Sequence, residues 1–302
     1  MPTPLPPFTI DQPTTLADAS RLLLAGDDES RSYAGGTELL LVMKHGGLRY
    51  DRLVDLKTIP GLDTVEERDG AIWIGALATH RALERSPLIG SRLPALAELE
   101  RKVANPRVRA TGTIGGNLCF AEPHSDPATL LLCLDSRLHV VGPDGERTVP
   151  IEELIVGPYE TSLGDGELLR AIEIPLAACA WRAEYRKLQV RERPMLGLAL
   201  ALDVDPAGGS IRSAKVAVGS VSPSPRRAPE AEALLVGSPS EAGGRVPEAA
   251  AALADAAELL DDLDGSAEYK RHLIGVLLRQ AFERLSASAA PSETGRNGRG
   301  AP

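Results

Sequence analysis

The sequence predicts an α+β protein with an N-terminal α/β region followed by a separate C-terminal α+β domain. Three observations lead to this prediction. Residues 1–57 read as strand, helix and strand; turn signals at Asp69-Gly70 and Pro143-Asp144-Gly145 mark two hairpins; and near Ala180 the pattern changes to three strands followed by helices. A chain of 302 residues is long enough for two domains.

The N-terminal unit begins with a helix. Thr14 precedes a helical run over residues 16–24, a threonine supplies the cap signal, and Gly26 follows the run. Strands and a helix alternate in the rest of this unit: a strand is expected over 31–34, a helix over 39–43 that ends at Gly46-Gly47, and a strand over 51–56. They predict a small α/β unit.

The next block carries the two hairpins. Their strands are expected at 65–67 with 71–76 and at 137–141 with 146–149, and a further strand at 168–174 ends at Pro175. Between the hairpins we expect helices over 94–103 and 127–134, the second with Pro127 in its first turn. A basic, glycine-bearing loop is expected over 105–117.

The C-terminal domain is expected to contain a three-stranded sheet with helices. The strands are predicted over 185–190, 198–204 and 211–218, and the helices over 228–235, 246–260 and 266–285. The predicted boundaries are 1–177 for the first domain, with subdomains 1–57 and 58–177, and 178–286 for the second. Residues 287–302 are small, polar and glycine-bearing, which predicts a disordered tail.

Composition excludes several classes of function. With 33 basic and 42 acidic residues and 3% aromatics, the chain is a poor partner for nucleic acid. No stretch approaches the ~20 apolar residues of a membrane span, and the proline-rich first residues do not predict a secretory signal. The cysteines Cys119, Cys133 and Cys179 are too few and too widely spaced for a four-thiolate metal or iron–sulfur site. No metal site is therefore expected, and the odd cysteine count favours a reducing compartment, the cytoplasm.

One glycine pair lies between a predicted strand and a predicted helix, in the segment Ala34-Gly35-Gly36-Thr37-Glu38. Such a turn brings backbone N–H groups close to a ligand, and a helix N-terminus adds about half a positive charge. Together they can hold a phosphate, with Thr37 as a hydroxyl donor or helix cap. The alternative is a helix start that needs only a tight turn, since the spacing matches neither the dinucleotide nor the P-loop motif.

A second glycine pair occurs in Thr113-Ile114-Gly115-Gly116-Asn117, which follows two arginines, Arg107 and Arg109. Glycines at this density allow close approach of the backbone, and the asparagine offers an amide. Two such loops could hold the two halves of one pyrophosphate. A purely structural turn remains an alternative for each loop singly and is weaker for both together.

These segments resemble a known family. Residues 33–40 and 113–119 are similar to the two flavin motifs of the FAD-binding subunits of molybdenum hydroxylases, the carbon monoxide and xanthine dehydrogenase-like enzymes. Residues 74–80 resemble that family's G-A-x-x-T-H element, residues 185–188 the start of its C-terminal domain, and residues 265–271 its closing-helix signature. The resemblance covers about residues 5–286.

The resemblance implies a fold and a binding site. The fold is a flavin domain of the p-cresol methylhydroxylase type, with FAD between two α/β subdomains, and a C-terminal domain. Gly35, Gly36, Gly115 and Gly116 would bring backbone donors to the pyrophosphate, and Thr37 and Thr113 would add hydroxyls. The full set of implied FAD-binding residues is Ala34, Gly35, Gly36, Thr37, Glu38, Thr79, Thr113, Ile114, Gly115, Gly116, Asn117, Asp126 and Lys187.

Two members of this set have implied roles of their own. Asp126 would accept hydrogen bonds from ribityl or ribose hydroxyls, and its alternative role is a helix N-cap before Pro127. Lys187 would lie near the isoalloxazine and favour its anionic reduced form, and its alternative is a solvated strand lysine. Cys119, beside the second motif, is interpreted as a packing residue.

The resemblance also implies the function of an electron-transfer subunit. Electrons would come from a large molybdopterin subunit through a small subunit with two [2Fe–2S] clusters, in a dimer of heterotrimers. The chain would pass them to an external acceptor and needs no catalytic residue of its own. Two alternatives remain. One is a stand-alone flavin oxidase using His80 or His124, and the other is a non-catalytic nucleotide-binding or assembly protein. The sequence leaves the substrate and the final acceptor undetermined.

Overall fold

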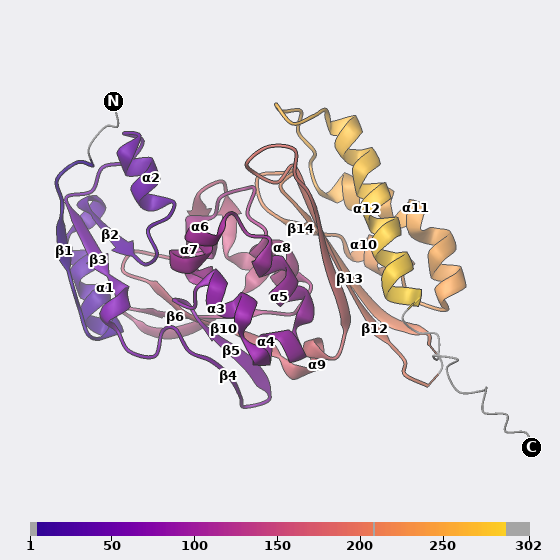
Figure 1. The fold of residues 1–302 in the computed structure, drawn as a ribbon, viewed down its shortest axis with the longest axis horizontal. Helices are drawn as coiled ribbons and strands as arrows, with labels where there is room; N and C mark the ends of the chain where they lie inside the picture. Colours follow the sequence, from indigo (N-terminus) through magenta and orange to yellow (C-terminus); the bar gives the residue numbers. More distant parts are fainter. Residues whose placement is uncertain (1–4, 208, 288–302) are drawn as a thin grey trace, which may run out of the picture.

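The computed structural model describes residues 5–207 and 209–287 and shows three adjoining regions (Figure 1). An N-terminal unit of three strands and two helices adjoins a central five-stranded sheet, and a C-terminal four-stranded sheet covered by helices follows. The predicted α+β class is confirmed. None of the described helices is long and apolar enough to cross a membrane.

The N-terminal unit is a parallel sheet in the order β1-β3-β2. Its strands are β1 (Thr9–Asp11), β2 (Ser30–Tyr33) and β3 (Arg52–Asp55), and its helices are α1 (Leu16–Ala25) and α2 (Leu39–Lys44). Thr15 caps α1 by accepting a hydrogen bond from the Asp18 N–H, and Gly26 ends the helix, as predicted. The sequence reading missed β1, because three mostly exposed residues carry no alternating pattern.

The central sheet is antiparallel, in the order β4-β5-β10-β6-β7. Its strands are β4 (Val65–Arg68), β5 (Ala71–Gly75), β6 (Arg137–Gly142), β7 (Gly145–Pro150) and β10 (Leu168–Pro175). Both predicted hairpins are present. Ile72, Ile74 and Ile172 are fully buried on one face, where short helices cover them.

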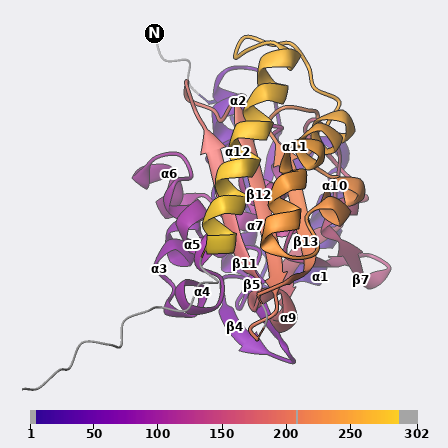
Figure 2. The same ribbon diagram turned by 90° about the vertical axis from the view of Figure 1, so that its right-hand side faces the viewer.

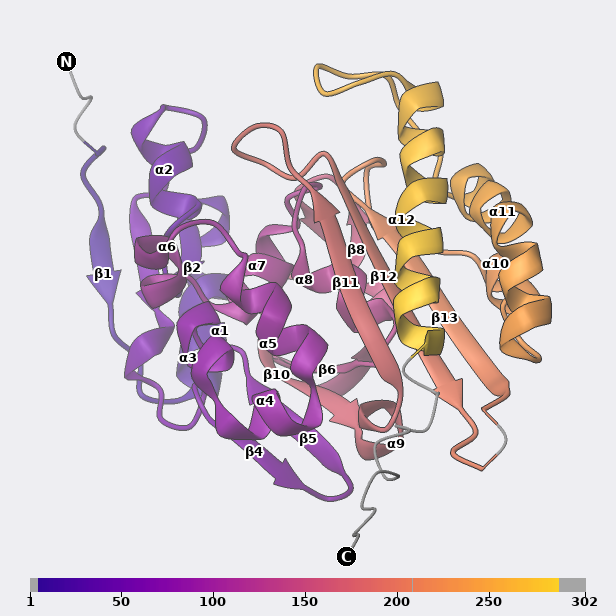
Figure 3. The same cartoon turned by 45° about the vertical axis from the view of Figure 1, so that its right-hand side comes forward.

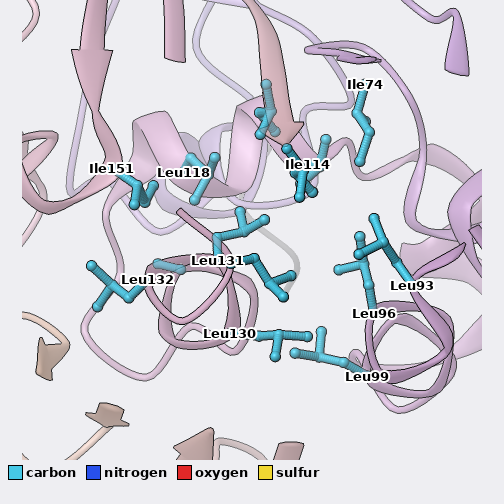
Figure 4. Packing of buried hydrophobic residues seen from close by; sticks show 14 of the residues in the cluster. Ile74, Leu93, Leu96, Leu99, Ile114, Leu118, Leu130, Leu131, Leu132 and Ile151 are labelled. Carbon is cyan, nitrogen blue, oxygen red and sulfur yellow. The ribbon is translucent and has the colours of Figure 1, made fainter. Parts of the chain in front are cut away.

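Six short helices lie in this region, and leucines of α5, α7 and α8 fill the core shown in Figure 4. They are α3 (His80–Arg85), α4 (Pro87–Arg92), α5 (Pro94–Arg101), α6 (Pro106–Thr111), α7 (Ile114–Phe120) and α8 (Pro127–Leu132). The loop predicted over 105–117 was therefore wrong, since it contains α6 and the start of α7. Side-chain oxygens of Asn105 and Thr113 cap these two helices. Helices of six or seven residues are too short to show an apolar period.

The C-terminal sheet has the order β11-β12-β13-β14. Its strands are β11 (Arg182–Leu188), β12 (Leu196–Val204), β13 (Ile211–Gly219) and β14 (Arg226–Arg227). The expectation of three strands was thus one short, because β14 is a two-residue strand paired with the end of β13. Its helices, α10 (Pro229–Leu234), α11 (Pro239–Ala256) and α12 (Ala267–Ala287), lie along one face (Figure 2).

Strand β12 shows why this sheet lies between two layers. Its leucines, such as Leu198 and Leu200, belong to the core under α11 and α12. Its alternating alanines, Ala199 and Ala201, belong instead to the core of the central region. Because successive side chains of a strand point to opposite faces, large residues face the C-terminal helices and small ones let the central helices approach. The C-terminal sheet is thereby packed against the region that carries the candidate site.

Three smaller departures remain. Helix α11 begins seven residues before the predicted start at Val246, because Ser238 and Glu241 form a capping box there. The small elements η1 (Asp27–Glu29), η2 (Leu56–Thr58), η3 (Ile151–Glu153), β8 (Ile155–Gly157), β9 (Glu160–Thr161) and α9 (Leu176–Cys179) were not predicted. Ala287 ends α12, and the rest of the predicted disordered tail lies outside the described residues.

Candidate cofactor-binding site

The first glycine segment, Ala34–Glu38, connects the end of β2 to the start of α2. Gly36 has a φ of +70°, a left-handed conformation that favours glycine. Within the described ranges, no protein acceptor receives the backbone N–H groups of Gly35, Gly36, Thr37 or Glu38. Four successive free donors at the start of a helix are suited to an anionic group such as phosphate. Thr37 does not cap α2, because Glu38 occupies the N-cap position without a side-chain bond.

The second glycine segment is the first turn of α7, and its N–H groups are already used. Ile114 donates to the Ala78 carbonyl at 3.0 Å and Gly115 to the Ala76 carbonyl at 2.9 Å. Gly116 donates to Oγ1 of Thr113 at 3.1 Å. In this structure the expected backbone donors of Gly115 and Gly116 therefore face protein acceptors. These bonds give the glycine pair a role in packing and capping.

Gly115 allows α7 to lie directly against the end of β5. A Cβ atom built on Gly115 would lie 2.5 Å from the carbonyl oxygen of Ala76 and 2.6 Å from its Cβ. Real side chains do not approach a backbone this closely, so the position is restricted to glycine. The second glycine pair thus fixes the place of α7, and with it Thr113 and Asn117.

The fold brings the two glycine segments together. A Cβ on Gly35 would lie 2.0 Å from the carbonyl oxygen of Thr111, the last residue of α6. A Cβ on Gly112 would lie 3.3 Å from Oγ1 of Thr37, and one on Gly116 would lie 3.8 Å from Cβ of Ala34. Figure 3 shows α6 and α7 beside β2. The free donors of the first segment therefore lie next to the first turn of α7.

The G-A-x-x-T-H element supports this turn from behind. Thr79 forms an isolated β-bridge with Thr113 and caps α3 by accepting from the Ala82 N–H at 3.1 Å. His80 donates its backbone N–H to the Gly112 carbonyl at 3.0 Å. Its buried ring holds Nδ1 2.6 Å from Oε2 of Glu100, which is fully buried. In this structure Thr79 and His80 position the second segment.

Asp126 and Lys187 form an ion pair between the central region and β11. Nζ of Lys187 lies 2.9 Å from Oδ2 of Asp126 and also donates to the Lys102 carbonyl at 2.7 Å. Tyr185 donates its hydroxyl to Oδ1 of Asp126 at 2.5 Å. Asp126 makes no capping bond to α8, and only 10% of the Lys187 side chain is exposed. The geometry thus opposes both alternatives, the helix N-cap and the solvated lysine.

The tyrosine was not singled out by sequence, yet it belongs to this cluster. Burial and the neighbouring Asp126 raise the pKa of Tyr185 well above its usual value, so its hydroxyl stays protonated and donates. A Cβ on Gly197, on the paired strand β12, would lie 2.2 Å from this hydroxyl. Glycine at 197 therefore makes room for the Tyr185–Asp126 hydrogen bond.

The remaining predicted residues lie close by. Asn117, on α7, accepts a hydrogen bond from Oγ of Ser125 at 2.5 Å, one residue before Asp126 in the chain. Ile114 is fully buried and belongs to the central core. Cys119 packs against the same core, and burial raises its pKa to about 12. This environment agrees with a packing role for the thiol.

Sequence reasoning missed a charged cluster beside the first segment. The guanidinium of Arg193 lies 2.9 Å from each carboxylate oxygen of Glu38 and 3.5 Å from Oε2 of Glu122. Nδ1 of His124 lies 2.9 Å from Oε1 of Glu122. The partners Arg193 and Glu38 are 155 positions apart, so no local pattern connects them. The sequence offered only an arginine in the compact segment 191–195.

The residues present fit a dinucleotide such as FAD. The free N–H groups of residues 35–38 suit a pyrophosphate, the buried Asp126 carboxylate suits a polyol hydroxyl, and Lys187 adds a cation. In the part of the chain that the structure describes, no three histidine, cysteine or acidic side chains gather as a metal site would require. The cysteines there are free.

Comparisons with known proteins identify the family of the chain. Residues 6–177 match the family described as the FAD binding domain in molybdopterin dehydrogenase, and residues 183–285 match the CO dehydrogenase flavoprotein C-terminal domain. The chain is 34% identical to the carbon monoxide dehydrogenase medium chain of Afipia carboxidovorans, over 93% of this chain and 98% of that one. It is 32% identical to the nicotine 6-hydroxylase medium subunit of Paenarthrobacter nicotinovorans, over 94% and 99% of the two chains. A crystal structure of Cu,Mo-CO dehydrogenase is similar, with a TM-score of 0.88 and 32% identity over 94% of this chain and 99% of that one.

Proposed function

The chain belongs to the family of FAD-binding medium subunits of molybdopterin dehydrogenases, and from that premise we propose that it transfers electrons from partner subunits to an external acceptor. It is an oxidoreductase subunit with FAD as its cofactor. The proposed electron source is the pair of [2Fe–2S] clusters of a small subunit, which are reduced by a large molybdopterin subunit. The proposed assembly is a dimer of heterotrimers in the cytoplasm.

One observation carries the assignment of the site. Residues 35–38 present four successive backbone donors that no described acceptor uses, and the first turn of α7 lies directly beside them. Donors that are fixed before binding cost little conformational entropy when an anion arrives. We assign these four groups to the pyrophosphate of FAD. Thr37 in the first segment and Thr113 in the second remain as hydroxyl donors.

The cluster around Asp126 has a second assigned role. Tyr185 and Lys187 hold its carboxylate in place, and the carboxylate can still accept hydrogen bonds from polyol hydroxyls. Lys187 keeps a positive charge near the cofactor and thereby favours an added negative charge there. Bound FAD supplies the exchange of one or two electrons. Ala34, Glu38, Thr79, Ile114 and Asn117 complete the proposed binding set by shaping and positioning the two segments.

The cofactor assignment is tested with two alanine variants of matched backbone cost. Gly36 and Gly46 have φ of +70° and +76°, so alanine imposes a similar backbone strain at both positions. At Gly36 its Cβ would also lie 2.4 Å from Cε2 of Tyr33, so the Tyr33 ring must shift there. Nothing lies within 4 Å of a Cβ on Gly46, which follows the C-terminal end of α2. The chain is purified with its partner subunits, denatured, and its released flavin is identified and quantified by chromatography.

We expect about one non-covalent FAD per chain in the wild type and in Gly46→Ala, and a clear loss in Gly36→Ala, because the free donors depend on the left-handed glycine. A wild-type complex without FAD would refute the function. Equal FAD content in the two variants would refute the site. Electron transfer is tested separately: adding the complex's substrate should bleach the flavin absorbance only when the [2Fe–2S] subunit is present.

A further inference from the structure

The hairpin between β11 and β12, residues 189–195, carries Arg193, which is not part of the proposed binding set. In Figure 3 this loop extends from the C-terminal sheet toward the N-terminal unit. The guanidinium of Arg193 contacts both carboxylate oxygens of Glu38, the last residue of the first glycine segment, at 2.9 Å. It also lies 3.5 Å from Glu122 of the central region. A single side chain therefore connects all three regions of the molecule.

The hairpin is held firmly enough to act as a support. Its first residues follow Lys187, which is fixed by Asp126. Its last residue, Met195, is 1% exposed and donates its N–H to the Leu188 carbonyl at 2.9 Å, which closes the loop. Gln189 donates its side-chain amide to the Glu192 carbonyl at 2.9 Å. Arg193 thus projects from a loop whose two ends are anchored.

A second anchor comes from the closing-helix signature, residues 265–271. Nζ of Lys270 is bonded to the Leu260 carbonyl at 2.9 Å and pairs with Asp262, and the lysine is 0% exposed. These contacts hold the loop before α12. From that loop Asp264 lies 3.5 Å from Arg191 of the hairpin. Through Lys270, the closing-helix signature therefore holds the loop whose Asp264 contacts the hairpin.

Glu38 is the point at which this support meets the cofactor segment. Its backbone N–H is one of the four free donors, while its side chain is held by Arg193. The segment is otherwise held by local contacts: Nζ of Lys57 donates to the Ala34 carbonyl at 3.1 Å, Leu40 and Val42 of α2 donate to the Gly36 and Glu38 carbonyls, and Gly35 packs on the end of α6. Of these contacts, only the pair with Arg193 reaches the C-terminal region. A bidentate guanidinium–carboxylate contact fixes orientation as well as distance.

We propose that Arg193 is a positioning residue that clasps the first glycine segment to the central and C-terminal regions and slows the release of FAD. This inference rests on the proposed assignment of residues 35–38 to the pyrophosphate. The clasp differs from a binding contact in one measurable respect. The clasp restrains the motion of the segment itself. Its loss is therefore detectable by amide hydrogen exchange without cofactor and by the release rate of bound FAD.

The test compares Arg193→Ala with Arg212→Ala in the full complex. Arg212 makes a similar bidentate pair with Asp203 and is similarly exposed, at 56% against 46% for Arg193, but it lies on the β12–β13 hairpin away from the site. FAD release is followed by the rise in flavin fluorescence after dilution into a scavenger apoflavoprotein. Hydrogen exchange of the Leu40 and Val42 amides, which donate to the Gly36 and Glu38 carbonyls at 3.1 and 3.0 Å, is measured on the apo form of the same proteins.

We expect Arg193→Ala to release FAD about two- to fivefold faster than wild type, which is the upper part of the range for a partly exposed ion pair with bidentate geometry. The same variant should exchange the Leu40 and Val42 amides faster, and Arg212→Ala should match wild type in both measurements. Arg193→Lys should restore part of the effect, because a single ammonium keeps the charge and loses the two-point contact. Salt should speed release in wild type more than in Arg193→Ala.

The outcomes separate the two proposals. If the wild-type complex contains no FAD, the proposed function fails and this inference fails with it. If the wild type retains FAD and Arg193→Ala releases it at the wild-type rate, only the clasp is overturned. Faster release without faster exchange of the Leu40 and Val42 amides would also overturn it, because Arg193 would then act as a direct ligand contact.

Discussion

Gly115→Ala is the substitution whose effect can be worked out most directly from the structure. The new Cβ would meet three backbone or Cβ atoms of Ala76 within 2.8 Å, so α7 and the end of β5 must separate. Forcing a methyl group into a packed position costs about 1–3 kcal/mol. The hydrogen bond from Gly115 to the Ala76 carbonyl would weaken, at about 1 kcal/mol. Alanine in a helix returns up to about 1 kcal/mol.

The expected net loss is therefore about 1–3 kcal/mol. Gly244→Ala is the matched control, because this glycine is also helical, in α11, and nothing lies within 4 Å of its Cβ position. It should stabilise the protein by about 0.5–1 kcal/mol. Urea unfolding followed by far-UV circular dichroism measures both changes, and flavin content measures the effect on the site. Equal urea midpoints for the two variants would show that α7 does not depend on contact with Ala76.

Three further predictions concern the neighbouring clusters. Tyr185→Phe should cost about 1–2 kcal/mol and lower FAD occupancy, because Asp126 loses a buried donor; unchanged occupancy would remove the tyrosine from the site. The hydrogen bond that the His124 ring donates to the Glu122 carboxylate raises the pKa of His124. The contribution of this pair to stability is therefore complete below the unfolded pKa of about 6.5 and is lost as pH rises through the folded pKa. His124→Asn should flatten this decline in urea midpoints measured across pH, and an unaltered slope would count against the pairing. Lys270→Ala should destabilise by about 2–4 kcal/mol, since the stem leaves a cavity and Asp262 loses its partner; a midpoint within error of wild type would contradict this.

The candidate site was predicted unevenly by sequence. The first glycine segment was recognised correctly as a strand-to-helix turn, since β2, Gly36 and α2 are adjacent in the chain and their signals are local. The second segment was read as a loop, because helices of six and seven residues give no apolar period and their cap residues also occur in turns. The FAD-binding role of the individual residues stays a prediction.

The sequence by itself determined the α+β class, both hairpins, the helix caps such as Thr15, and the family to which the chain belongs. These features depend on residues within a few positions of one another or on several ordered motifs. The tertiary structure alone decided that Gly115 serves close packing on Ala76, that Tyr185 holds Asp126 from 59 positions away, and that Arg193 reaches Glu38 from 155 positions away. The physical reason is that local conformation follows short-range backbone and capping preferences, whereas these contacts exist only after the layers have packed and brought distant segments together.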